Sequence, residues 1–209
     1  MSQFFPFPAE KQTALSEHLR RRRYGCFELT DALRPALDLR ILPQEGYRRS
    51  LYRDPVSGLF VRVVTCAASG EHLFDLFMDT LDILAPTVEL ALGISSTGRR
   101  VEYRRQQCEL VILKSIFYDF EKLILHDGSL GLALSDGHTE VSFDEHKLLV
   151  ISGDGAQESE FLLDRYGIHY LRRLQLLTDS EHIHTTTRNW CHEADRLKIS
   201  LGLDDYSLF

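Results

Sequence analysis

The chain has 209 residues, of which 44% are hydrophobic and 26% are charged, and its formal net charge is -7. This composition is typical of globular proteins and excludes a disordered chain. The negative charge argues against a nucleic-acid binder whose affinity depends on phosphate neutralisation. The first residues, MSQFFPFPAEK, lack the features of a signal peptide, and no apolar run reaches the ~18 residues of a membrane span. We therefore expect a cytoplasmic protein that does not contact a membrane.

The four cysteines are widely spaced and contain no CxxC pair, which is the pattern expected of reduced thiols. We interpret all of them as small, buried apolar residues, since no spacing typical of a zinc knuckle is present. They are Cys26, Cys66, Cys108 and Cys191.

In chain order, the first predicted element is a helix over 9–24 that ends at Gly25. A hairpin follows, with YRRSLYR and LFVRVVT on either side of a turn that contains Pro and Gly. Ser69 is placed to cap a helix over 70–84. The alternating segment TVELALGIS predicts a half-buried strand, and RRVEYRR is its expected hairpin partner.

The second half begins with a predicted helix over 109–126. Residues 130–152 then predict a three-stranded meander, with turns at Asp136 and Gly137 and again at Asp144 and Glu145. A helix over 156–166 should end at Gly167, and the last helix is expected over 188–201.

The order of these elements favours the α+β class with mostly antiparallel sheet, because the strands come as two hairpins and a meander instead of alternating singly with helices. The sequence contains no linker rich in Gly, Ser or Pro. We expect one compact domain over 1–209, organised either as a single unit or as two tightly packed halves near 1–107 and 108–209.

Basic charge is concentrated in the first half of the chain. Residues 1–105 contain 15 Lys and Arg against 13 Asp and Glu, whereas residues 106–209 contain 9 against 18. If the arginine-bearing strands lie together, their guanidinium groups would bind carboxylate or phosphate. The predicted ligand-binding residues are Arg48, Arg49, Arg53, Arg62, Arg99, Arg100, Arg104 and Arg105.

The first hypothesis is therefore a non-enzymatic binding or regulatory protein that recognises an acidic protein surface or a small anionic ligand. Self-association through the acidic half is included in this hypothesis, and no cofactor is predicted under it. The alternative interpretation is that the arginines shield exposed strand edges against aggregation.

The second hypothesis is a metal-assisted hydrolase or lyase centred on the segment SEHIHTTTRNWCHE. On a strand, His182 and His184 would share a face and converge on zinc or another divalent transition metal, with Asp179 as an available oxygen ligand. Cys191 and His192 fall on a predicted helix that points them apart. The alternative is that the histidines are locally hydrogen-bonded groups in a loop before a capped helix.

A further group of polar residues lies at the ends of the predicted meander. Histidine beside a carboxylate is suited to general acid–base work, but turn formation explains the same residues, and we favour the latter. They are His126, Asp127, His138, Asp144, Glu145 and His146. Motifs of nucleotide-binding loops, zincins and α/β-hydrolases are absent from the sequence.

Overall fold

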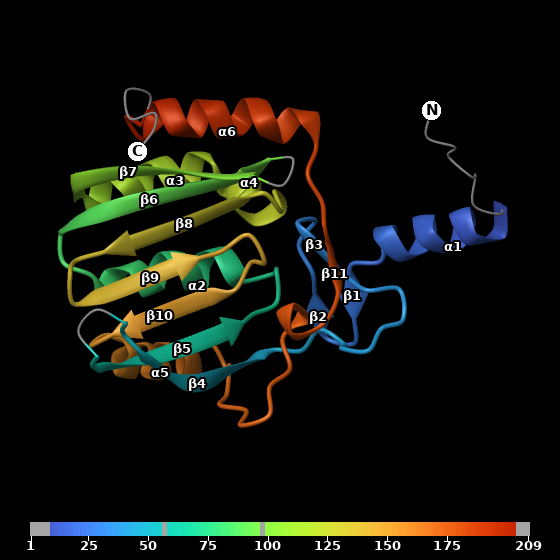
Figure 1. Cartoon of the computed structure of the whole chain (residues 1–209), viewed down its shortest axis with the longest axis horizontal. Coiled ribbons are helices and arrows are strands. Elements are labelled where there is room, and N and C mark those ends of the chain that lie inside the picture. The colour runs from blue at the N-terminus through green and yellow to red at the C-terminus, as the bar shows by residue number, and fades with distance from the viewer. Residues whose placement is uncertain (1–8, 56–57, 97–98, 204–209) are drawn as a thin grey trace.

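The computed structural model describes residues 9–55, 58–96 and 99–203. Its main feature is a seven-stranded antiparallel sheet with the order β4-β5-β10-β9-β8-β6-β7 (Figure 1). The predicted meander forms the centre, and the two predicted hairpins form the edges, so the α+β class is confirmed. The strands are β4 (Gly46–Arg53), β5 (Phe60–Ala67), β6 (Thr87–Ser96), β7 (Arg99–Glu109), β8 (Leu130–Ser135), β9 (Thr139–Phe143) and β10 (Leu149–Gly153).

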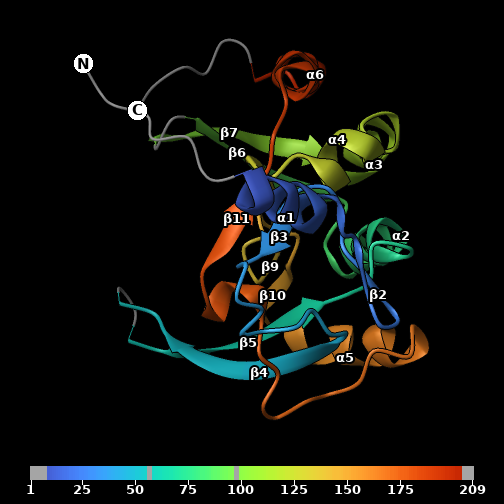
Figure 2. The ribbon, with the colours of Figure 1, turned by 90° about the vertical axis from the view of Figure 1, so that its right-hand side faces the viewer.

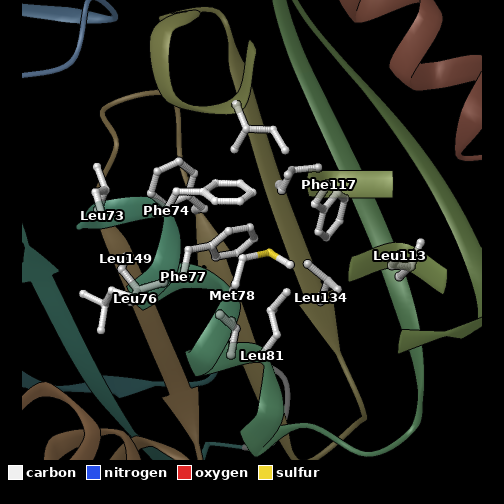
Figure 3. Packing of buried hydrophobic residues seen from close by; sticks show 14 of the residues in the cluster. Leu73, Phe74, Leu76, Phe77, Met78, Leu81, Leu113, Phe117, Leu134 and Leu149 are labelled. Carbon is white, nitrogen blue, oxygen red and sulfur yellow. The ribbon is translucent and has the colours of Figure 1, made fainter. Parts of the chain in front are cut away.

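Helices cover one face of this sheet (Figure 2). They are α2 (Leu73–Thr80), which continues into the 3₁₀ helix η1 (Leu81–Ile83), α3 (Leu110–Asp119), α4 (Glu121–His126) and α5 (Ala156–Arg165). The main core lies between the helices and the sheet, where Phe77 of α2 stacks on Phe143 of β9 with ring centroids 5.0 Å apart and also contacts Phe117 (Figure 3). None of the described helices is long and apolar enough to cross a membrane.

The other face of the sheet carries small side chains at its centre. A cross-strand row runs from Ala91 through Ala133 and Ser142 to Val150. Antiparallel sheets commonly bury one face and leave the other in water, which explains why the two faces differ in side-chain size and polarity.

A smaller unit lies at one end of the strands of the large sheet (Figure 1). It consists of α1 (Ala9–Arg20), the hairpin of β1 (Arg23–Tyr24) and β2 (Phe27–Glu28), the strand β3 (Leu33–Pro35), the 3₁₀ helix η2 (Leu177–Asp179) and the strand β11 (His182–His184). β11 pairs antiparallel with β3, so segments nearly 150 residues apart meet in a second sheet. This unit has its own apolar cluster, which includes Phe27, Leu33 and Leu177.

The last helix, α6 (Arg188–Ser200), lies beyond the β7 edge and buries Ala194 and Leu197 in the main core (Figure 1). Its start at Arg188 agrees with the sequence prediction. Gly167 also ends α5 as predicted: its φ is +75° and the N–H of Ile168 bonds to the carbonyl of Leu163.

Several boundaries differ from the sequence predictions. The first helix ends at Arg20, and Gly25 occupies the turn between β1 and β2 instead of a helix cap. The predicted helix over 109–126 is divided at Phe120 into α3 and α4. Ser69 does not cap α2, because its hydroxyl accepts the N–H of Glu28 from the neighbouring unit.

The cysteines are all free thiols. Cys66 and Cys108 are buried as predicted, but Cys26 and Cys191 are exposed. Burial raises the pKa of the Cys66 thiol, so that it stays protonated in the core.

Candidate metal centre

The arginines predicted to bind an anion do not share one surface. Arg48, Arg49 and Arg53 lie on β4, and Arg62 lies on β5. The other four, Arg99, Arg100, Arg104 and Arg105, lie on β7, at the opposite edge of the large sheet. Five strands separate β4 from β7. At about 4.8 Å between neighbouring strands, the two groups are roughly 29 Å apart.

Most of these arginines also bind an acceptor within the chain. Four of them pair with carboxylates: Arg48 with Asp179, Arg49 with Glu160, Arg100 with Glu145, and Arg104 with Glu89 and Glu102. Three donate to other oxygens: Arg53 to the carbonyl of Gly58, Arg62 to the amide of Gln157, and Arg105 to the carbonyl of Leu201. The fold does not assemble a common anion-binding patch, and recognition of an acidic partner stays a prediction for each edge by itself.

Three histidines come together where the smaller unit meets the large sheet. One ring nitrogen from each of His146, His182 and His184 lies within 4.8 Å of the others. Their ring centroids are 4.8 to 5.0 Å apart. Within the described part of the chain, no other three His, Cys, Asp or Glu side chains converge in this way. We call these residues the histidine cluster.

The local structure explains how each ring reaches the cluster. His182 and His184 lie two residues apart on β11 and therefore project from the same face of the strand, as their alternation predicts. β11 is held by β3, with His182 opposite Pro35 and His184 opposite Leu33.

His146 enters the cluster from the turn between β9 and β10. One carboxylate oxygen of Asp144 accepts the N–H groups of His146 and Leu148, which closes this turn. Lys147 adopts a φ of +60° and donates from its buried ammonium to the carbonyl of Leu130. Burial lowers the pKa of Lys147 to about 8. The turn is thus tied down on both sides of His146.

The hydrogen bonds of the three rings leave the same atom free on each. The Nδ1 atoms of His182 and His184 are each 2.8 Å from a backbone carbonyl, that of Ser180 and that of Gly128 respectively. Nδ1 of His146 is 3.1 Å from a carboxylate oxygen of Asp144. Because carbonyl and carboxylate oxygens only accept, every Nδ1 carries the hydrogen, and in the neutral ring the lone pair resides on Nε2.

The electrostatics of the three rings differ. The hydrogen bond that His146 donates to the carboxylate of Asp144 raises the pKa of His146 above its ordinary value. Burial lowers the pKa of His184, and the neighbouring rings of His146 and His182 add to this effect. Close packing of three basic rings therefore disfavours protonation of His184, the state in which it would be unable to bind a metal.

Asp179, the oxygen ligand suggested by the sequence, lies outside the histidine cluster. Its carboxylate makes two hydrogen bonds with the guanidinium of Arg48, at 2.8 and 3.2 Å. Burial alone would raise the pKa of Asp179, but the hydrogen bonds from Arg48 and the N–H of Leu176 hold it below its ordinary value. The third position that the sequence assigned to Asp179 is taken by His146.

Three imidazoles with free Nε2 atoms match the ligand set of catalytic zinc sites, which use three protein ligands and keep a position for water or substrate. Three nitrogens at 2.0–2.1 Å from one ion are about 3.3 Å apart. Those of the cluster lie within 4.8 Å of one another, so binding of one ion would draw them together by up to about 1.5 Å. In other proteins, a histidine that binds a metal donates its second ring N–H to a carbonyl or carboxylate oxygen, which orients the ring. The three histidines of the cluster donate from Nδ1 in the same way.

A pocket of about 210 Å³ adjoins the cluster. Its lining consists of Ser95, Gly128, Ser129, Glu145, His184, Thr185 and Thr186. We call it the hydroxyl pocket, because four of its seven residues carry hydroxyl groups. It is smaller than the ~300–1,000 Å³ pockets that hold drug-sized ligands, so any ligand in it is small.

Sequence reasoning placed His146 and Glu145 in a separate candidate group, as turn formers. They do form a turn, but the same turn presents them to β11. The only local feature that could have indicated a metal-binding role for His146 is its spacing from Asp144, since carboxylate–histidine contacts recur around bound metals. His126, Asp127 and His138 from that group lie outside the cluster. Comparison with known proteins gives no family model, no curated protein and no solved structure that matches the chain.

Proposed function

We propose that the protein binds a divalent transition metal, with zinc as the first choice, through the histidine cluster, and that it uses the metal for hydrolysis or lyase chemistry. The observation that supports this most directly is the convergence of three imidazoles whose Nδ1 hydrogens are all donated to backbone or carboxylate oxygens. Because Nδ1 is engaged on every ring, Nε2 is the nitrogen that each histidine can offer to a metal.

The coordination number supports chemistry over a purely structural role. Structural zinc sites have four protein ligands, usually including cysteine, whereas catalytic sites have three and an open position. Cys191 is exposed on α6 and its Sγ lies 3.7 Å from the carbonyl of Thr187, outside the cluster. A metal held by the cluster would therefore keep a position for water, and a bound metal makes water acidic enough to react near neutral pH.

The metal site is tested by titrating metal-free protein with Zn²⁺ in a calorimeter and by elemental analysis after dialysis. We expect one ion per chain. Replacing His146, His182 or His184 by Ala should weaken binding at least about 100-fold, because loss of a direct ligand exceeds the 10- to 100-fold effect of losing an outer partner.

The matched control is His138→Ala. His138 lies in the turn between β8 and β9, outside the cluster, and its replacement should leave zinc affinity unchanged. Binding that is equally strong in the cluster variants and in His138→Ala would contradict the proposal, as would the absence of stoichiometric binding by the unaltered protein.

A further inference from the structure

Glu145 is an acidic side chain next to the histidine cluster. It directly precedes His146 in the turn and lines the hydroxyl pocket together with His184. Its side chain is only 19% exposed. It is not one of the three converging ligands.

Arg100 holds this carboxylate over the same face of the sheet. One terminal nitrogen of its guanidinium lies 3.0 Å from both oxygens of Glu145. Arg100 comes from the edge strand β7 and Glu145 from the β9–β10 turn, so the pair joins strands that are not neighbours. The ion pair restricts where the carboxylate can lie.

Two glycines make room for this pair. Gly93 and Gly131 face each other across β6 and β8. A Cβ added to Gly93 would lie 2.8 Å from a nitrogen of Arg100, and one added to Gly131 would lie 3.3 Å from an oxygen of Glu145. Glycine weakens strands and marks places where other groups approach the backbone closely. An ion pair that is partly open to water contributes little to stability by itself, so this construction points to a role for the placement of Glu145.

The lining of the hydroxyl pocket indicates the kind of substrate. None of its described residues is Lys or Arg, and it already contains the carboxylate of Glu145. These features disfavour a phosphate or carboxylate ligand and suit a small uncharged one. Ser129 and Thr185 already donate their hydroxyl hydrogens, to the carboxylate of Asp127 and the carbonyl of Asp31. The hydroxyl groups of Ser95 and Thr186 provide the hydrogen-bond donors for a substrate carbonyl oxygen.

Resting on the proposed metal site, we propose that Glu145 is the general base that deprotonates the attacking water, that Arg100 positions it, and that the hydroxyl pocket binds a small uncharged ester or amide. In the reaction, the water proton passes to the Glu145 carboxylate while the water oxygen bonds to the carbonyl carbon. The bond from that carbon to the leaving oxygen or nitrogen then breaks, and Glu145 returns the proton to the leaving group. One water is consumed, and no oxidant or reductant is needed.

The test measures hydrolysis of 4-nitrophenyl acetate by the zinc-loaded protein and its Glu145→Gln variant, with zinc affinity measured on the same samples. General bases contribute roughly 10²- to 10⁴-fold, so Glu145→Gln should lower kcat/KM at least about 100-fold while the zinc affinity changes less than about threefold. The matched control is Glu140→Gln on β9, which should retain the full rate.

The outcomes separate this proposal from the metal site. If zinc binds and the protein hydrolyses the ester no faster than free zinc, the proposal is overturned and the metal site stands. A Glu145→Gln variant with the original rate also overturns it. If Glu145→Gln loses zinc affinity tenfold or more, Glu145 is a metal ligand and not the base.

The positioning role of Arg100 has its own readout. Arg100→Gln should lower kcat about tenfold with KM within twofold of the original value, because the pocket that binds the ester is unaltered. Arg100→Lys keeps a cation beside Glu145 and should restore most of the rate. Equal losses in both variants, or a loss confined to KM, would overturn this role.

Discussion

His126 differs from the three clustered histidines in what its ring does. Its Nδ1 lies 3.0 Å from the backbone nitrogen of Asp31 and accepts that N–H, whereas the clustered rings donate from Nδ1. A ring that accepts at Nδ1 must keep a lone pair there, and protonation destroys the hydrogen bond. Burial accordingly lowers the pKa of His126.

This arrangement predicts that part of the folding stability depends on pH. The pKa of His126 in the folded state lies below its unfolded value of about 6.5, so its contribution is complete above that pH and is lost as the pH falls toward the folded pKa. His126→Asn, which keeps an acceptor but does not titrate, should flatten the dependence between pH 7 and pH 5. Urea unfolding of both proteins across this range measures the difference.

The control is His169→Asn, since the exposed ring of His169 lies 3.7 Å from the carboxylate of Asp164 and accepts no backbone N–H from the described part of the chain. Its pH dependence should follow that of the unaltered protein. If the free energy of unfolding of His126→Asn changed with pH as steeply as that of the unaltered protein, the assignment of His126 as a neutral acceptor would be contradicted.

At the scale of elements, the spacing of apolar residues along the sequence predicts individual strands and the face on which their side chains lie. The alternation of Leu130, Leu132 and Leu134 predicts β8, and the same period of two predicts that His182 and His184 share a face. That His146 joins them depends on the pairing of β11 with β3, which no local pattern reveals. The opposite placement of β4 and β7, which separates the arginines, likewise depends on strand order and not on the sequence of either strand.

The loop between α4 and β8 predicts a sensitive position at Gly128. Its N–H donates to the carbonyl of Thr185, and its own carbonyl accepts the Nδ1 hydrogen of His184. A Cβ here would lie 2.2 Å from the carbonyl oxygen of Ala32, a backbone atom that side-chain movement cannot relieve. Gly128→Ala should therefore displace β11, lower the free energy of unfolding by about 2 kcal/mol or more, and weaken zinc binding 10- to 100-fold.

Gly137→Ala is the matched control for denaturant unfolding and zinc titration. Gly137 lies in the β8–β9 turn with a φ of +91°, and no atom lies within 4 Å of an added Cβ. Gly137→Ala should lower the free energy of unfolding by about 1–2 kcal/mol through backbone strain and leave the zinc affinity unchanged. Similar zinc affinities in both variants would show that Gly128 does not orient His184.

At the scale of the whole molecule, the histidine cluster bridges two parts with separate apolar clusters. His146 belongs to the large sheet, and His182 and His184 belong to the small one. A metal bound by all three would link these parts, and binding free energy becomes folding free energy wherever the site exists only in the folded state.

Zinc should therefore slow hydrogen exchange unevenly over the protein. At about 100 times the dissociation constant, the stabilisation is about 2.7 kcal/mol. We expect slower exchange in β3 and β11, whose opening breaks the metal site, and little change in the local fluctuations of α6. Exchange followed by mass spectrometry, with His146→Ala as the variant that cannot form the bridge, measures this. Uniform slowing, or none in β3 and β11, would contradict it.

The pairing of β3 with β11 also has a consequence for synthesis. Leu33, Arg34 and Pro35 are synthesised almost 150 residues before their strand partner. During that interval the backbone of β3 must be hydrated or held by a chaperone, because its native hydrogen-bond partners do not yet exist. The strands of the large sheet are therefore all synthesised before β11, and the histidine cluster forms only after β11 has followed them.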